Sequence, residues 1–145
     1  MKRLVPTVSG AVFNPEGKLL LTLRSEKVLC PGTWCLPGGR LVGGDDWLTT
    51  LRKEVQEEVG LRVVEQKLIG IYSDPKVSIF HVDEGTLHFL AASFLVTSFS
   101  GEVQPNDEVC EWGWFSESEL PEPLLVTEPM KIRDAFRFRG EVSVR

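Results

Sequence analysis

Two patterns of hydrophobic and polar positions alternate along this chain, and they separate strands from helices. Short apolar or alternating runs bounded by Gly, Pro, Asn or Asp predict strands. The strands expected on this basis span residues 5–13, 18–24, 34–36, 63–73, 77–82, 86–97 and 109–115. The Asn-Pro-Glu-Gly turn at residues 14–17 suits a chain reversal, so the first two strands are expected to form a hairpin.

Two segments have the boundaries of helices. Asp45 and Asp46 supply an N-cap and a favourable charge for the dipole of the first helix, which Gly60 would end as a C-cap. A second helix is expected at residues 127–136 with Thr127 as its cap, and a short helical turn at residues 116–120. Residues 141–145 are expected to form an irregular tail. No repeat or linker interrupts the pattern, which predicts one mixed α/β domain over residues 1–145.

Composition narrows the class of protein. Hydrophobic residues make up 42% and charged residues 26% of the chain, a balance typical of globular proteins. The net charge of -5 argues against a nucleic acid polymer as partner, because binding to its backbone needs surplus Lys and Arg. A phosphorylated small molecule stays compatible with this charge, since a bound cation can reverse the local sign.

The sequence also favours a cytoplasmic location. The first residues show no signal-peptide pattern, and the most apolar stretch, residues 89–96, is far shorter than the roughly 20 residues of a membrane helix. Cys30, Cys35 and Cys110 are odd in number and lack a CxxC spacing, which favours reduced thiols over a disulfide or a zinc site.

Three glutamates on the first helix raise the question of function. A helix turns about 100° per residue, so Glu54, Glu57 and Glu58 cover an arc of roughly 100° beside the arc of Leu51 and Val55. On an exposed helix such like charges cost only about 0.2–0.5 kcal/mol per pair, and a solvated acidic surface would explain them. In a cleft, two charges about 6 Å apart repel by nearer 3 kcal/mol at an effective dielectric constant of 20. Hard oxygen ligands gathered in that way are what Mg²⁺ or Mn²⁺ requires.

The surrounding residues favour the second interpretation. The sequence GRLVGGDDWLTTLRKEVQEEVGL resembles the Nudix box: a glycine, five residues, a glutamate, seven residues, then Arg-Glu-aliphatic-any-Glu-Glu-any-Gly-aliphatic. The positions in register are Gly39, Glu54, Val55, Glu57, Glu58, Gly60 and Leu61. The stretch GTWCLPGG before it also looks like the lead-in common in the family. The resemblance implies a Nudix-like α/β/α sandwich with a mixed central sheet, in which the box forms a loop-helix-loop.

Two positions depart from the pattern. Asp45 stands where the family has glutamate, and Lys53 where it has arginine. An ammonium is a point charge, whereas a guanidinium can hold a carboxylate in a bidentate fork. We therefore expect Lys53 to neutralise neighbouring carboxylates while orienting them less firmly. These supporting positions also leave open a catalytically weak, nucleotide-binding module as an alternative.

The resemblance implies roles for individual residues. Metal ligands would be Glu54, Glu57 and Glu58, the backbone carbonyl of Gly38, and a carboxylate near the last long strand. Glu108 is the candidate for that carboxylate, with Asp107 and Glu111 as competitors. A purely structural role for Glu108, as a polar residue of a turn, is the alternative. The general base would be Glu54, then Glu57. Substrate contacts are expected at Gly39 and at Arg24, where an ordinary surface arginine fits equally well.

The implied activity is Mg²⁺-dependent hydrolysis of a diphosphate linkage in a small-molecule nucleotide, with Mn²⁺ as an alternative to Mg²⁺. ADP-ribose or a sugar nucleotide is favoured, because Pro75 lies fifteen residues after Gly60, as in family members that split such substrates. A nucleoside triphosphate pyrophosphohydrolase that releases a nucleoside monophosphate and pyrophosphate is the alternative, suggested by the segment VCEWGW and the compact length. A homodimer is a further expectation from the family alone.

Overall fold

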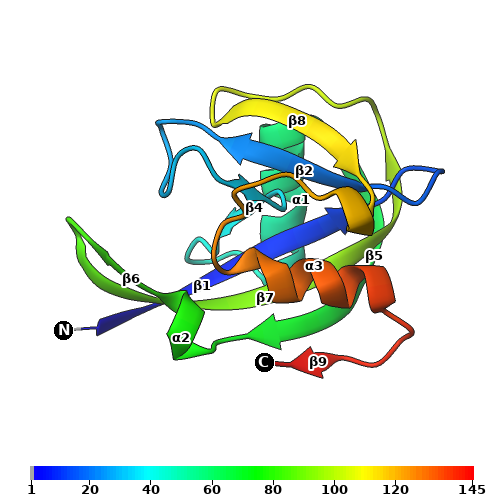
Figure 1. Ribbon diagram of the computed structural model, residues 1–145. Helices are drawn as coiled ribbons and strands as arrows, with labels where there is room; N and C mark the ends of the chain where they lie inside the picture. The colour runs from blue at the N-terminus through cyan, green and yellow to red at the C-terminus, as the bar shows by residue number, and fades with distance from the viewer. Residues whose placement is uncertain (1) are drawn as a thin grey trace.

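The computed structural model describes residues 2–145 as two sheets and their covering helices (Figure 1). The strands are β1 (Lys2–Val12), β2 (Leu19–Arg24), β3 (Trp34–Cys35), β4 (Gly38–Arg40), β5 (Arg62–Tyr72), β6 (Ile79–Val82), β7 (Gly85–Ser100), β8 (Val109–Phe115) and β9 (Ser143–Val144). The helices are α1 (Trp47–Val59), α2 (Pro75–Ser78), the 3-10 turn η1 (Glu117–Glu119) and α3 (Glu128–Arg137). None of the helices within residues 2–145 combines the length and apolar character that crossing a bilayer would need.

The larger sheet is mixed and has six strands. Its order is β4-β1-β7-β5-β9, and β6 pairs with β7. The β1–β7 and β5–β9 pairs are parallel, whereas β4–β1, β5–β7 and β6–β7 are antiparallel. The smaller sheet has the order β3-β2-β8. This arrangement confirms the expected α/β class with a mixed sheet.

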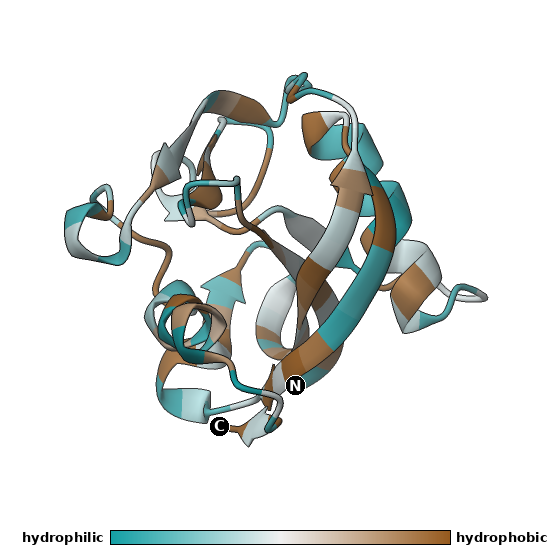
Figure 2. Cartoon of the chain, turned by 90° about the vertical axis from the view of Figure 1, so that its right-hand side faces the viewer, coloured by the Kyte–Doolittle hydropathy of each residue, from teal (hydrophilic) through white to brown (hydrophobic). Residues whose placement is uncertain are grey.

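Two hydrophobic clusters place the two long helices on opposite sides. The α1 cluster gathers Leu51 and Val55 of α1 with Val8 of β1 and Leu20 of β2. The α3 cluster gathers Ile132 of α3 with residues that alternate with these along the same strands. Successive side chains of a strand point to opposite faces, which Figure 2 shows as alternating hydropathy along the long strands. The strands therefore lie between α1 and α3.

Helix α1 has the boundaries that the sequence predicts. The Asp46 side chain accepts a hydrogen bond from the Thr49 backbone N–H, which caps the first turn. At the other end Gly60 adopts the left-handed conformation, with φ of 75°, that glycine accommodates without strain. This helix carries the three glutamates on a fixed frame.

The predicted hairpin of the first two long strands is wrong. Strand β1 pairs with β4 and β7, whereas β2 pairs with β3 and β8, and the two meet only at a bridge between Phe13 and Leu19. The turn at residues 14–17 does reverse the chain, since Gly17 donates its backbone N–H to the Asn14 carbonyl. A turn fixes only local direction; the pairing partners lie far away in the sequence.

Three other local predictions also need correction. Residues 141–145 are not an irregular tail: β9 pairs with β5, and Arg145 exchanges backbone hydrogen bonds with Ile71 and Ser73. Residues 77 and 78, expected to begin a strand, instead belong to α2, because Pro75 begins a helical turn that Asp74 caps. Thr127 does not cap α3 through its side chain. Its hydroxyl donates to the Glu128 carboxylate instead.

Candidate active site

A cleft of about 820 Å³ lies on the α3 side of the larger sheet. Its lining comes from β1, β2, β4, β5, β6 and β7, from α1, α2 and α3, and from the loop before β8. Cavities that bind small molecules usually measure about 300–1,000 Å³. The cleft therefore has room for a nucleotide-sized ligand.

Two glutamates of α1 face this cleft. Glu54 and Glu58 are four residues apart, so their side chains lie one above the other on one side of the helix. Glu58 is only 7% exposed. Burial, together with the negative charges of Glu54 and Glu108, raises its pKa to about 8. Burial, with Glu57 and Glu108, raises the pKa of Glu54 to about 7.

The glycines before the helix allow the backbone to approach these carboxylates. Gly38 donates its backbone N–H to Glu58 Oε2 across 3.3 Å. A Cβ added at Gly39 would lie 2.5 Å from the Glu54 carboxylate, and one at Gly38 would lie 2.1 Å from the Val8 carbonyl oxygen. The backbone contact at Gly38 admits only glycine, whereas a side chain at Gly39 would displace the Glu54 carboxylate. The absence of side chains at Gly38 and Gly39 thus lets this backbone lie close to the carboxylates of Glu54 and Glu58.

Glu108 approaches the helix from the loop before β8. It lines the cleft, and its charge contributes to the raised pKa of both Glu54 and Glu58. Its competitors lie elsewhere: Asp107 forms a surface ion pair with Lys27, and the exposed Glu111 does not line the cleft. The geometry therefore favours Glu108 among the three candidates.

Glu57 points away from this group. Its side chain is exposed and is not part of the cleft wall. It still acts at a distance, because its charge is the largest contribution after burial to the raised pKa of Glu54. The sequence predicted Glu57 as a metal ligand and second choice of base. Of the four glutamates predicted as metal ligands, Glu54, Glu58 and Glu108 line the cleft and Glu57 does not.

The donor set suits a divalent cation. Within residues 2–145, none of these carboxylates takes part in an ion pair. Carboxylate and carbonyl oxygens are the ligands that Mg²⁺ and Mn²⁺ prefer. Across the same residues, however, no three Asp, Glu, His or Cys side chains converge tightly enough to define a metal site. The carboxylates lie in the same cleft but do not converge on a single metal position.

The two departures from the box pattern contact each other. Lys53 Nζ lies 2.8 Å from Asp45 Oδ2. The hydrogen bond and charge of Asp45 raise the pKa of Lys53, and Glu57 adds a smaller contribution. Lys53 thus pairs with Asp45 at the surface, and neither residue contacts the cleft carboxylates through a hydrogen bond among residues 2–145.

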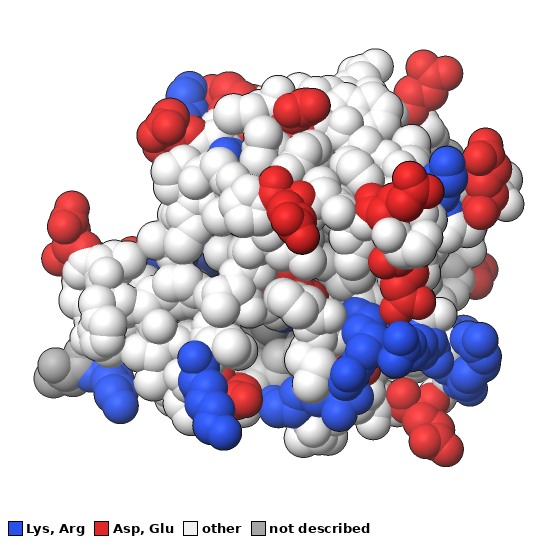
Figure 3. All heavy atoms as spheres, viewed as in Figure 1, with Lys and Arg blue, Asp and Glu red and all other residues white. Residues whose placement is uncertain are grey.

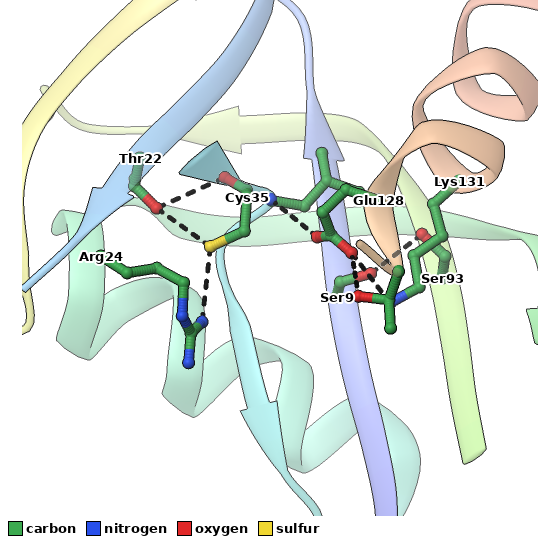
Figure 4. Close-up of polar contacts among 9 residues, drawn as sticks. Ser9, Thr22, Arg24, Cys35, Ser93, Glu128 and Lys131 are labelled. Carbon is green, nitrogen blue, oxygen red and sulfur yellow. Dashed lines mark hydrogen bonds and ion pairs between the residues drawn. The ribbon is translucent and has the colours of Figure 1, made fainter. Parts of the chain in front are cut away.

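Arg24 is held in the cleft wall rather than free on the surface. Its Nε donates to the Leu29 carbonyl, and Nη1 lies 3.5 Å from Cys35 Sγ (Figure 4). Burial and the charge of Glu128 raise the pKa of Cys35 to about 11, so this thiol stays protonated at neutral pH. Gly39, the other predicted substrate contact, also lines the cleft.

The opposite wall holds charged residues that the sequence analysis missed. Glu128 and Lys131 of α3 are buried and form an ion pair at 3.2 Å (Figure 4). One turn later and outside the cleft lining, Asp134 accepts hydrogen bonds from Tyr72 and from the Arg145 guanidinium, two residues that do line the cleft. A signal for this wall was present: three charged residues recur every third position on the apolar face of the last helix.

Basic residues are unevenly spread over the surface. Figure 3 shows Lys and Arg side chains gathered over α3, on a face whose upper part carries mainly acidic ones. Arg137 of this region pairs with Glu117. The local sign near α3 therefore differs from the overall charge of -5.

Comparisons with known proteins identify the family of this chain. The NUDIX domain model matches residues 3–136. A MutT-like protein of Streptomyces ambofaciens is 28% identical over 134 residues, covering 92% of this chain and 78% of its own length. An ADP-ribose pyrophosphatase of Methanocaldococcus jannaschii is 26% identical over 138 residues, covering 94% and 77%.

Two further relatives complete the picture. The mouse 8-oxo-dGDP phosphatase NUDT18 is 30% identical over 128 residues, which cover 86% of this chain but only 36% of the mouse protein. The chain thus spans about a third of that relative's length. The crystal structure of a MutT NUDIX hydrolase from Burkholderia pseudomallei superposes with a TM-score of 0.73 at 26% identity, covering 93% of this chain and 97% of that one.

Proposed function

This chain belongs to the NUDIX family of hydrolases, and we propose that it hydrolyses the diphosphate linkage of a small-molecule nucleotide with Mg²⁺ as its cation. ADP-ribose or a sugar nucleotide is the favoured substrate. The observation that carries the proposal is a set of carboxylates in the wall of a nucleotide-sized cleft: Glu54, Glu58 and Glu108, which form no ion pair within residues 2–145.

The carboxylates divide the chemistry between them. Glu58, Glu108 and Glu54, with the Gly38 carbonyl, would hold the cation, which neutralises charge on phosphate oxygens and activates water when bound. Glu54 is half-buried and lies at the edge of the group, so it is our choice for the base that takes the proton of the attacking water. Glu57 remains the second choice, from the exposed side of the helix.

The remainder of the cleft suits a nucleoside. Strand β1 pairs with Gly38 at Ser9 and with Phe89 at Val5. These two levels of the cleft are four residues apart along β1, or about 13 Å. At the far level Phe80 and Phe89 pack edge to face with ring centroids 5.3 Å apart, and both line the cleft. Aromatic and apolar walls of this kind bind the faces of nucleobases. A ligand with a diphosphate and a base would contact both ends.

The choice of ADP-ribose rests on two supports. The Methanocaldococcus jannaschii relative is an ADP-ribose pyrophosphatase, and its match extends over most of both chains. Pro75, the sequence signal for this class, begins α2, whose capping residue Asp74 lines the cleft. The similarity to the 8-oxo-dGDP phosphatase favours the second candidate, a nucleoside di- or triphosphate as substrate.

The contact between Lys53 and Asp45 weakens the third interpretation, a drifted binding module. Because the two unusual residues pair with each other at 2.8 Å, the changes leave Glu54 and Glu58 in place. We therefore favour an active hydrolase over a catalytically weak binding protein.

The test is a product analysis. Purified protein is incubated with Mg²⁺ and, separately, ADP-ribose, sugar nucleotides, and ordinary and oxidised nucleoside di- and triphosphates, with Glu58→Gln as the matched control. We expect AMP and ribose 5-phosphate from ADP-ribose, and neither from the variant. Monophosphate from a nucleoside di- or triphosphate instead would move the protein to the second candidate. No product from any compound with Mg²⁺ or Mn²⁺ would overturn the hydrolase proposal.

A further inference from the structure

The backbone that leads to Gly38 is tied to the segment before α3. The Trp34 N–H donates to the Pro123 carbonyl, and the Leu125 N–H donates to the Trp34 carbonyl, both at 2.9 Å. Two residues later the Leu36 N–H donates to a side chain, Glu128 Oε1, at 3.0 Å. This contact joins elements 92 residues apart in the sequence.

Glu128 is unusually deep for a carboxylate. It is 2% exposed, and its second oxygen accepts from the Thr127 hydroxyl at 2.9 Å and pairs with Lys131 at 3.2 Å. Burying a carboxylate is costly unless it is paired and hydrogen-bonded, so this one is held by three partners. Of these three partners, the Leu36 N–H alone comes from outside α3 and its cap.

The contact continues to the cleft carboxylates. Pro37 accepts the Gly10 N–H through its carbonyl at 2.9 Å, and the Gly38 N–H then reaches Glu58. Gly38 also packs on the Val8 carbonyl so closely that no Cβ fits. Leu36 and Gly38 are only two residues apart, so a shift of the first would carry the second away from Glu58.

We propose that Glu128 is a positioning residue for the cation site: by fixing Leu36 it keeps Gly38 beside Glu58. The inference rests on the proposed function, since it assigns a cation to these carboxylates. Within residues 2–145, Glu128 forms no hydrogen bond to Glu54, Glu58 or Glu108. It acts through the 36–38 backbone, and what matters is its hydrogen-bond acceptor at the right reach, not its charge.

Four variants separate the reach of the residue 128 side chain, its charge, and its contribution to folding. Glu128→Ala removes the acceptor, and Glu128→Asp keeps the charge but withdraws it by one methylene. Glu128→Gln keeps an acceptor at full reach without the charge. Thr127→Val is the matched control, because it removes a hydrogen bond to the same carboxylate but leaves the Leu36 contact.

The readout is Mn²⁺ affinity of the full chain without substrate, measured by the paramagnetic resonance of free Mn²⁺, with the thermal unfolding of each metal-free variant recorded alongside. We expect Glu128→Ala and Glu128→Asp to weaken Mn²⁺ binding by about 10-fold or more, the usual effect of losing a residue that orients metal ligands. Glu128→Gln and Thr127→Val should stay within about threefold of the wild type.

Several results would overturn the proposal. If Glu128→Ala and Glu128→Asp bind Mn²⁺ like the wild type, Glu128 only stabilises the fold. If Glu128→Ala does not fold, Glu128→Asp decides alone. A loss in Glu128→Gln as large as in Glu128→Asp would assign the effect to the ion pair with Lys131. Failure of the wild type to bind Mn²⁺ would instead remove the cation site itself, and with it the proposed function.

Discussion

The two walls of the cleft treat the same kind of residue in opposite ways. On the α3 wall, the buried Glu128 pairs with Lys131 at 3.2 Å. One turn on, outside the cleft lining, Asp134 is paired with Arg145 at 2.8 Å, and the Arg145 and Tyr72 hydrogen bonds hold its pKa below the ordinary value. On the α1 wall, burial and mutual repulsion raise the pKa of Glu54 and Glu58 to about 7 and about 8. The acids of α3 are paired with cations of the chain itself. Within residues 2–145, Glu54 and Glu58 form no such pair, and the proposed metal cation would supply the missing positive charge.

The difference has an energetic meaning. Two carboxylates one helical turn apart, about 6 Å, repel by roughly 3 kcal/mol at an effective dielectric constant of 20. A fold keeps such repulsion where function requires it, and strongly perturbed pKa values mark such places. Because this chain pairs its buried acids near α3, the absence of ion pairs at Glu54 and Glu58 within residues 2–145 is what the proposed cation site requires.

The largest expected effect is on catalysis by the α1 wall. Glu58→Gln should lower kcat/KM by at least about 100-fold, because it removes a charged oxygen ligand from the cation site. Above about pH 8, where Glu58 is charged, the metal-free variant should be at least as stable as the wild type, since a buried charge has been removed. Steady-state kinetics and thermal unfolding check the two parts. Near-normal turnover would contradict the comparison.

A substitution at Asp134, the paired acid of α3 beyond the cleft lining, should have the reverse effect. Asp134→Asn should lower the free energy of unfolding by about 1–3 kcal/mol, because charge-assisted hydrogen bonds to Tyr72 and Arg145 weaken. The turnover of the folded protein should change little. Urea unfolding and kinetics measure both. A large loss of kcat at normal stability would show that this wall is also catalytic.

The pH dependence of that loss follows from the sign of the pKa shift. The folded-state pKa of Asp134 is lowered, so its contribution to stability is present above its ordinary pKa of 3.8 and is lost as the pH falls through the folded value. The gap in stability between wild type and Asp134→Asn should therefore narrow below about pH 4. A gap that stays constant down to pH 2 would contradict the pairing.

The α1 wall should show the opposite trend. The folded-state pKa of Glu58 is raised from 4.5 to about 8, so its contribution is present below pH 4.5 and is lost as the pH rises through 8. The unfolding midpoint of the metal-free protein should therefore decline over this range, and less steeply in Glu58→Gln. Thermal scans in a chelator at several pH values test this. Equal slopes would exclude a repulsive wall.

The smallest effect is expected at the surface pair beside the box. Lys53→Arg restores the family residue but keeps a partner for Asp45, and kcat/KM should stay within about threefold of the wild type because exposed ion pairs contribute little. Kinetics under the same conditions provide the check. A gain well beyond threefold would mean that Lys53 limits the orientation of the carboxylates.

Local signals in the sequence predicted much of this picture. The caps Asp46 and Gly60 mark α1 because each satisfies backbone groups of its own helix, and strand β8 begins and ends where its apolar pattern does. The box spacing places Glu54 and Glu58 on one helix face for the same reason. These features depend on residues within one or two turns of each other.

Long-range contacts could not be predicted in this way. The pairing of β1 with β7, the addition of β9 to β5, and the contact from Glu128 to Leu36 join residues that are distant in the chain. A helical wheel does not distinguish Glu57 from Glu54 and Glu58. Which of these carboxylates face the cleft depends on tertiary packing, which a wheel does not include. The paired α3 wall was hidden because charged residues on a helix normally face solvent.

The most direct test of the central claim is a calorimetric titration of Mn²⁺ into the metal-free protein at pH 7, in two buffers with different ionisation enthalpies. Glu54 and Glu58 bind protons at this pH only if their pKa values are raised, and a cation displaces those protons. We predict binding with net proton release that is reduced in Glu58→Gln. Absence of binding, or binding without proton release, would contradict the account.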